Sequence, residues 1–98
     1  MKAVLLERRR VILSPTAFAE IVVWRLPSPV SGCRHLFKYR LALVEHGACV
    51  LRYDNESGKG DHVHVGKVEQ QYEFQSPSRL LADFSEAIER WRHEHRET

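Results

Sequence analysis

The chain is predicted to be a single α+β domain over residues 1–98, in which an antiparallel meander of four or five strands is covered by one C-terminal helix. Three observations predict this fold. Short β-branched and aromatic runs alternate with turn residues over the first two thirds of the chain. Segment 36–44 alternates apolar with mostly charged side chains, as a half-buried strand does. The last segment places large apolar residues at helical spacing after a Ser-Pro pair.

Composition narrows the class of protein. A chain of 98 residues with 43% hydrophobic and 29% charged residues is typical of one soluble globular domain. A formal charge of only +2 excludes a strongly basic nucleic-acid wrapper. Cys33 and Cys49 lack metal-binding spacing and are expected to be reduced thiols. No secretory leader is recognised, and no apolar stretch approaches the ~20 residues of a membrane span. A cytoplasmic location without membrane contact is therefore expected.

The N-terminal elements come first. The apolar runs 3–6 and 11–13 flank Arg8-Arg9-Arg10 and fit one long strand or two short ones. On a strand the outer two arginines share a face, which favours a solvated edge over a track for RNA. Ser14-Pro15 breaks the pattern. Segment 17–26 is apolar on both faces, as an interior strand is.

A central hairpin follows the Pro- and Ser-containing loop 27–32. Strand 36–44 turns at 45–47 into the returning strand 49–53. The preferred register places Leu43 near Cys49, Leu41 near Leu51 and Tyr39 near Tyr53. This register buries one apolar face, and a slip of one residue would destroy it. The opposite face then gathers four polar side chains: Lys38, Arg40, Arg52 and Asp54.

The remaining elements complete the meander. Segment 55–64 is expected to turn and close over the polar face of the hairpin, with His62 and His64 on one face of its strand. Tyr72 and Phe74 either extend this strand or form a return leg. Ser76 and Pro77 predict a helix start, as N-cap and first helical residue. The helix is expected to cover the sheet through Leu80, Leu81, Phe84, Ile88 and Trp91.

Segment 52–64 concentrates titratable groups. It holds arginine, lysine, aspartates and two histidines among turn-forming residues. A connecting loop needs the turn formers but not this range of side chains, although many charged loops are only solvated. Histidine, carboxylate and cation together can exchange a proton and neutralise a phosphate.

These residues also resemble a known family. The stretches concerned are Tyr39-Arg40-Leu41, Arg52-Tyr53-Asp54-Asn55, Lys59-Gly60-Asp61-His62-x-His64, Glu69, Tyr72-x-Phe74 and 80–84. They resemble the TumE-like toxin proteins of bacterial toxin–antitoxin modules, over a span from Phe37 to Trp91. The resemblance implies a small cytoplasmic toxin with a cognate antitoxin. It assigns no mechanism to any residue.

The first hypothesis is metal-independent RNA cleavage by the toxin of a type II module, without a cofactor. His62 and His64 would serve as base and acid, and Asp54 or Asp61 would orient an imidazole. Arg40 and Arg52 would clamp the phosphate, with Lys38 on the same face and Lys59 adding a point charge. Such a site would work in EDTA.

Two alternatives stay open. His62-x-His64 with Asp54 or Asp61 has ligand types that suit a divalent metal, which would indicate a metal-dependent phosphoryl- or nucleotidyl-transfer toxin. A non-catalytic module would dock nucleic acid or an acidic partner on the basic face. Trp24 is a candidate for base stacking there, whereas Tyr39 and Tyr53 are expected on the core side. The expected partners are RNA and an antitoxin, for which a helix-turn-helix DNA-binding protein is a candidate.

Overall fold

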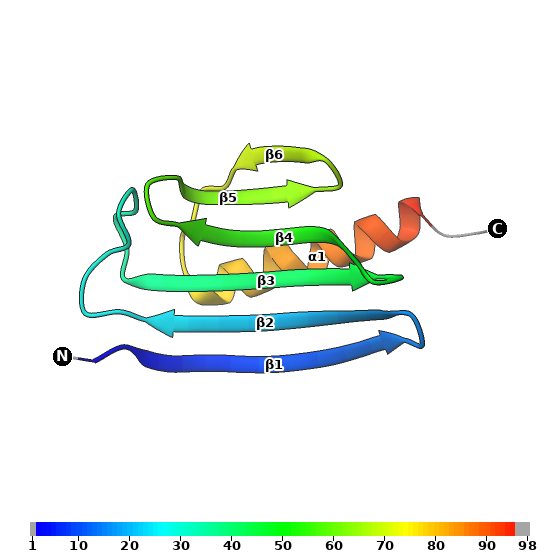
Figure 1. Cartoon of the computed structure of the whole chain (residues 1–98), viewed down its shortest axis with the longest axis horizontal. Coiled ribbons are helices and arrows are strands. Elements are labelled where there is room, and N and C mark those ends of the chain that lie inside the picture. Colours follow the sequence, from blue (N-terminus) through cyan, green and yellow to red (C-terminus); the bar gives the residue numbers. More distant parts are fainter. Residues whose placement is uncertain (1, 96–98) are drawn as a thin grey trace.

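Six strands and one helix make up the computed structural model, which describes residues 2–95. The strands form one antiparallel sheet in the order of the sequence (Figure 1). The elements are β1 (Val4–Ser14), β2 (Ala17–Arg25), β3 (Phe37–Glu45), β4 (Ala48–Glu56), β5 (Gly60–Val65), β6 (Val68–Gln71) and α1 (Pro77–Glu94). The predicted α+β meander with a C-terminal helix is confirmed.

The sheet has one strand more than the upper prediction of five. The two N-terminal apolar runs join through the Arg triplet into the single strand β1, which lies at the edge of the sheet with Arg8 and Arg10 on one face and Arg9 on the other. The additional strand is β6. All four of its residues are exposed, so it carries no apolar periodicity that the sequence would reveal.

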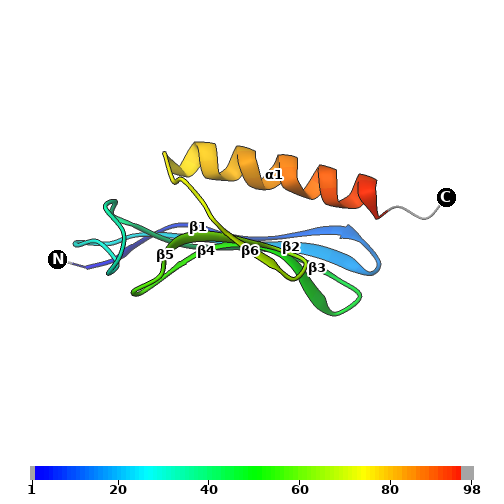
Figure 2. The same ribbon diagram turned by 90° about the horizontal axis from the view of Figure 1, so that it is seen from above.

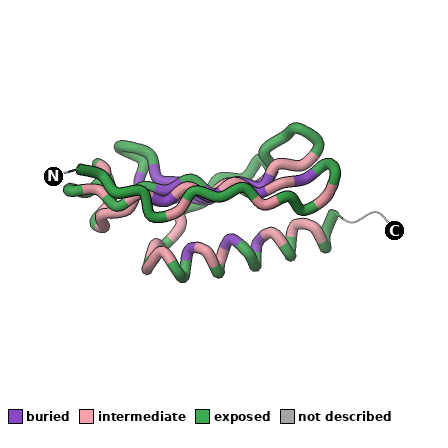
Figure 3. The backbone as a smooth tube through the Cα atoms, turned by 90° about the horizontal axis from the view of Figure 1, so that it is seen from below, coloured by how far each residue is buried: buried purple, intermediate pink, exposed green. Residues whose placement is uncertain are grey.

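Only one face of the sheet is covered. Helix α1 lies along that face and packs against β3 and β4 (Figure 2). The buried positions of α1 turn toward the sheet (Figure 3). The face away from α1, here called the open face, has no second layer among the described residues. Helix α1 is not long and apolar enough to cross a membrane.

The helix begins where the sequence predicts. The Ser76 hydroxyl accepts a hydrogen bond from the Arg79 amide at 3.1 Å, and Pro77 is the first helical residue. Within the predicted apolar stripe, Leu80 and Phe84 are buried. The others, Leu81, Ile88 and Trp91, are partly buried against the same core.

The central hairpin has the predicted faces but not the predicted register. Leu43 pairs with Leu51 and Leu41 pairs with Tyr53, which is two residues away from the expected pairing. Because side chains alternate with a period of two, this shift leaves Leu41, Leu43, Leu51 and Tyr53 on their predicted core face. Cys49 is the exception, because it lies beyond a bulge, pairs with Val44 and is exposed. The cause is a two-residue turn at His46 and Gly47, both with positive φ, and a bulge beside it.

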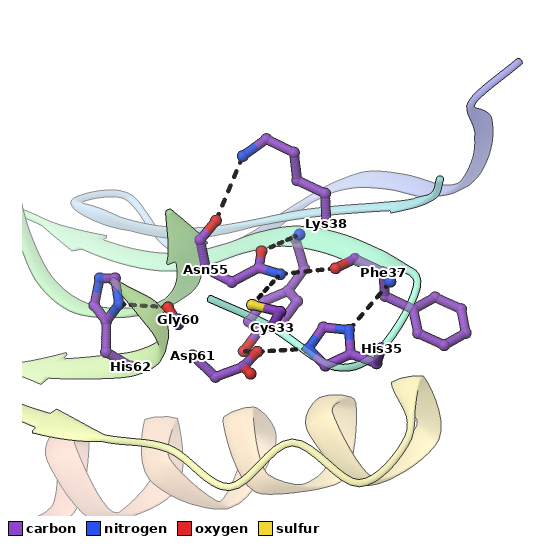
Figure 4. A network of polar contacts seen from close by, with 9 residues as sticks. Cys33, His35, Phe37, Lys38, Asn55, Gly60, Asp61 and His62 are labelled. Carbon is purple, nitrogen blue, oxygen red and sulfur yellow. Dashed lines mark hydrogen bonds and ion pairs between the residues drawn. The ribbon is translucent and has the colours of Figure 1, made fainter. Parts of the chain in front are cut away.

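Asn55 joins β3 to β4 at the end of the hairpin that lies opposite the turn. Backbone pairing between the two strands ends at Asp54, and the buried Asn55 side chain supplies the next hydrogen bonds to β3. The amide nitrogen donates to the Phe37 carbonyl at 2.7 Å, and the amide oxygen accepts from the Tyr39 amide at 3.0 Å (Figure 4). Asn55 thus fixes the ends of β3 and β4 next to the polar face.

Replacing Asn55 is expected to destabilise the fold. Asn55→Ala leaves the Phe37 carbonyl and the Tyr39 amide without partners, at a cost of about 1–3 kcal/mol for each buried group left unpaired. Urea unfolding measures the effect. Ser57→Ala, in the adjacent exposed turn, is the control and should match the parent. An Asn55→Ala variant as stable as this control would refute the clamp.

Candidate functional site

A pocket of about 330 Å³ lies on the open face where β2, β3 and β4 run side by side. Lys38 and Arg40 from β3, and Arg52 and Asp54 from β4, line it, as the predicted polar face requires. Its other walls come from Val22, Trp24, Tyr39, Asn55 and Glu56. Three cations and two carboxylates, Asp54 and Glu56, therefore surround a cavity large enough for a small ligand.

Strand pairing explains why these side chains meet. Arg40 lies opposite Asp54, and Arg52 lies opposite Ala42, one step along the same face of the sheet. Trp24 lies opposite Lys38 on the other side of β3. Arg40 and Arg52 therefore share a face, as the phosphate-clamp hypothesis requires.

Asp54 connects the pocket to the histidines of β5. Its Oδ2 lies 3.1 Å from Arg52 Nε, and its Oδ1 lies 2.7 Å from His62 Nε2. The other ring nitrogen of His62, Nδ1, lies 3.1 Å from the carbonyl oxygen of Gly60 (Figure 4). A carbonyl oxygen can only accept, so Nδ1 carries a proton.

The contacts of Asp54 are short but poorly directed. Arg52 Nε, Asp54 Oδ1 and His62 Nε2 are all buried, and within residues 2–95 none of the three has a hydrogen-bond partner. The distances are well within range, so the angles are what exclude hydrogen bonds at these ion pairs. Buried polar atoms in this condition call for an explanation.

The two histidines share the open face, as predicted. Their ring centroids are 5.1 Å apart and the rings are nearly perpendicular. They differ in access, because His62 is 3% exposed whereas the His64 side chain is 27% exposed. His64 Nε2 also lies 3.9 Å from Glu69 Oε1 on β6. His64 is therefore the imidazole that a ligand in solution can reach.

The expectation that segment 55–64 closes over the polar face is wrong. The chain turns at 57–59 and returns as β5, which pairs edge to edge with β4 and continues the sheet. Six residues of β5 pair with six residues of β4, and these backbone hydrogen bonds keep β5 in the plane of the sheet. Segment 55–64 therefore does not cover the pocket.

Four of the predicted site residues do not line this pocket: His62 and His64 lie beside it, next to Asp54, whereas Lys59 and Asp61 lie away from it. Lys59 is exposed in the turn, 4.0 Å from Glu56. Asp61 lies one position from His62 and therefore points to the α1 side of the sheet, whereas Lys38 points away from α1 (Figure 4). Of the two aspartates proposed to orient an imidazole, Asp54 contacts His62 and Asp61 contacts His35.

Asp61 belongs to a second polar cluster, on the α1 side. Its Oδ1 accepts from the Tyr39 hydroxyl at 2.6 Å and from His35 Nε2 at 2.8 Å. His35 Nδ1 accepts from the Phe37 amide at 3.1 Å, which fixes this tautomer. Burial and the hydrogen bond to Asp61 raise the pKa of Tyr39 well above its usual range, so Tyr39 remains a donor. These hydrogen bonds brace the loop before β3 against β5.

Two groups of side chains could hold a metal ion. One is Asp54, His62 and His64 on the open face, and the other is Cys33, His35 and Asp61 in the second cluster. In each group the donor atoms lie within 4.8 Å of one another. Burial is the main cause that raises the pKa of the Cys33 thiol, which disfavours the thiolate form that binds metal.

Sequence reasoning missed three contributors to these sites. Cys33 and His35 lie in a loop without periodicity, and no local pattern places them beside Asp61. The sequence indicates only a turn at Asn55, although the Asn55 side chain joins β3 to the end of β4. Trp24, a stacking candidate, does line the pocket, and Tyr39 and Tyr53 are buried on the core side as expected.

Comparison with models of protein families gives a match that covers nearly the whole chain. A family model described as Toxin TumE matches residues 2–92, which include every site residue named above. No curated protein and no solved structure matches the chain.

Proposed function

The chain belongs to the TumE toxin family, and from that premise we propose that it is the toxin of a type II toxin–antitoxin module and that it cleaves RNA in the cytoplasm. Membership makes the protein a toxin and implies an antitoxin partner. RNA as the target, cleavage as the reaction and a helix-turn-helix antitoxin belong to the proposal.

The observation that carries the proposal is the cationic pocket. Lys38, Arg40 and Arg52 line one cavity, although the whole chain has a formal charge of only +2. Arg52 Nε lies 3.1 Å from Asp54 Oδ2, and this ion pair keeps the guanidinium beside the pocket before a ligand binds. Arg40 is exposed and free to reach an anion. Such a group of cations suits a phosphodiester.

The pocket also offers a surface for a base. Trp24 and Val22 form its apolar wall beside Lys38 and Arg40. Aromatic side chains next to a cationic groove bind single-stranded nucleic acid by stacking, with little dependence on sequence. A nucleotide can therefore place its base on Trp24 and its phosphate on the arginines.

Cleavage is supported by what adjoins the pocket. A phosphate held by Arg40 and Arg52 would lie next to Asp54, which is in contact with His62 and close to His64. Stabilising the charge that builds on a phosphate is a large part of catalysing its transfer. A binding module would need the cations but not the carboxylate–imidazole group.

The metal-free acid–base scheme stays a prediction. It requires both imidazoles to reach the RNA, but His62 is 3% exposed and both of its ring nitrogens face protein oxygens. The buried, poorly directed contact between Asp54 and His62 favours the metal-dependent alternative. RNA cleavage is common to both schemes.

Arg40→Lys is expected to weaken RNA binding. A lysine keeps the charge but loses the planar fork that holds a phosphate with two parallel bonds. Losing one charge-assisted hydrogen bond of about 1.5–3 kcal/mol lowers affinity about 10- to 100-fold. Binding of a non-cleavable RNA analogue measures this. Arg90→Lys, on the exposed side of α1, is the control. Equal affinities of the two variants would argue against Arg40 as a phosphate clamp.

Expression in bacterial cells that lack the antitoxin tests the proposal as a whole. The wild-type chain should arrest growth, and new RNA 5′ ends should accumulate. The double variant Arg40→Ala/Arg52→Ala should do neither at equal protein level, because it cannot hold the phosphate. Growth arrest without RNA fragments would support the assignment as a toxin and contradict RNA cleavage as its mode of action.

A further inference from the structure

Three metal-binding side chains converge on the open face beside the pocket. Asp54 comes from β4, and His62 and His64 come from β5. Asp54 lies opposite His62, and Arg52 lies opposite His64, so the three side chains project from the same side of two paired strands. Their potential donor atoms all lie within 4.8 Å of one another.

Two of these donor atoms, Asp54 Oδ1 and His62 Nε2, are buried and have no hydrogen-bond partner within residues 2–95. His62 Nδ1 carries a proton because it faces the Gly60 carbonyl at 3.1 Å, so neutral His62 presents the lone pair of Nε2 to Asp54 Oδ1. Two acceptors 2.7 Å apart repel each other unless a positive charge lies between them. Their angles do not suit a shared proton, because neither atom has a hydrogen-bond partner within the described chain. A metal cation located off the line that joins the two atoms would explain both their short separation and their lack of hydrogen-bond partners.

The surroundings orient the donors as they do at metal sites. A metal-binding histidine usually donates its other ring N–H to a carbonyl or carboxylate, and Gly60 supplies that carbonyl for His62. Arg52 Nε forms an ion pair with Asp54 Oδ2 at 3.1 Å, and Oδ1 is the oxygen that faces His62 Nε2 at 2.7 Å. A side chain at position 60 would be crowded, since its Cβ would lie 3.1 Å from Gly32 O, and the positive φ there also favours glycine.

The second cluster lacks these signs. Asp61 Oδ1 already accepts two hydrogen bonds, from Tyr39 and His35, and His35 has a protein partner at each ring nitrogen. No atom of this cluster is a buried polar atom without a partner among residues 2–95. The two groups of donors therefore serve as site and internal control in one chain.

We propose that Asp54, His62 and His64 bind one divalent transition-metal ion of the Zn²⁺ or Mn²⁺ type. Two imidazoles and one carboxylate suit such ions, whereas Mg²⁺ and Ca²⁺ prefer oxygen ligands throughout. Three protein ligands leave a coordination position open to a phosphate oxygen arriving between Arg40 and Arg52. Only this use of the ion, as a Lewis acid on the phosphate, rests on the proposed function; the binding does not.

Titration calorimetry on the chelator-treated, full-length protein tests the proposal, with ZnCl₂ and MnCl₂ as probes. At least one of the two should bind at one ion per chain and raise the melting temperature. His64→Ala should lower the affinity about 100-fold or more, because it removes a ligand. His64 is the preferred variant since it is partly exposed and its loss leaves the buried Asp54–His62 pair intact.

Two control variants make the result decisive. His93→Ala removes an exposed imidazole from α1, and Cys33→Ser alters the second cluster. Both should bind the ion like the parent. Absence of binding, or binding that survives His64→Ala and is lost with Cys33→Ser or His93→Ala, would overturn the proposal. Chelation separates the metal site from the proposed function. RNA cleavage that persists in EDTA would support the ribonuclease and show that the ion takes no part in its mechanism. Metal binding without any RNA cleavage would support the metal site and contradict the proposed ribonuclease activity.

Discussion

His64→Ala is expected to lower RNA cleavage by about 10²–10⁴-fold, the usual contribution of a catalytic proton carrier. Loss of a metal ligand should also reduce the rate strongly, because the ion that polarises the phosphate is lost with it. Single-turnover cleavage of a labelled RNA measures the rate. The variant should keep most of the stability of the parent, since the side chain is 27% exposed and is not among the hydrophobic core residues of the described chain.

A matched control separates this effect from the general loss of an imidazole. His93→Ala removes an exposed histidine from α1, on the covered side of the sheet, and should cleave at the parental rate. A His64→Ala variant that cleaves as fast as His93→Ala would place the chemistry elsewhere in the molecule.

Phe84→Ala is expected to have the largest effect on stability. Phe84 is 1% exposed and contacts Tyr53 edge to face, with ring centroids 6.0 Å apart. Removing a fully buried phenyl ring costs about 3–5 kcal/mol, through lost burial and the cavity that remains. This is a large part of the stability of a small domain, so the urea midpoint should fall sharply.

Ser85→Ala is the control for Phe84→Ala. It changes the neighbouring exposed position of α1 and should leave the midpoint nearly unchanged. A Phe84→Ala protein with the parental midpoint would mean that α1 contributes little to the core.

The sequence predicted the faces of the sheet better than its register. Alternation along β3 and β4 depends on burial, and burial recurs every second residue, so Arg40 and Arg52 were placed together correctly. The register depended on the turn. The sequence did not show that His46 takes positive φ, which only a few per cent of non-glycine residues do.

The site was predicted in part for the same reason. Alternation along β5 placed His62 and His64 on one face, and the same alternation excludes Asp61 from it. The pairing of β4 with β5 then selected Asp54 as the contact of His62. Cys33 and His35 approach Asp61 across a loop, and such long-range contacts leave no periodic signal in a single sequence.

Incubation of purified, antitoxin-free protein with defined RNA tests the central claim most directly. The assay is run with and without ribosomes, with and without added Zn²⁺ or Mn²⁺, and with the Arg40→Ala/Arg52→Ala variant beside the parent. The open-face pocket predicts discrete RNA fragments from the parent, in at least one of these conditions, and intact RNA from the variant. RNA that stays intact with the parent in every condition, or equal cleavage by both proteins, would contradict the assignment of this pocket as a site of RNA cleavage.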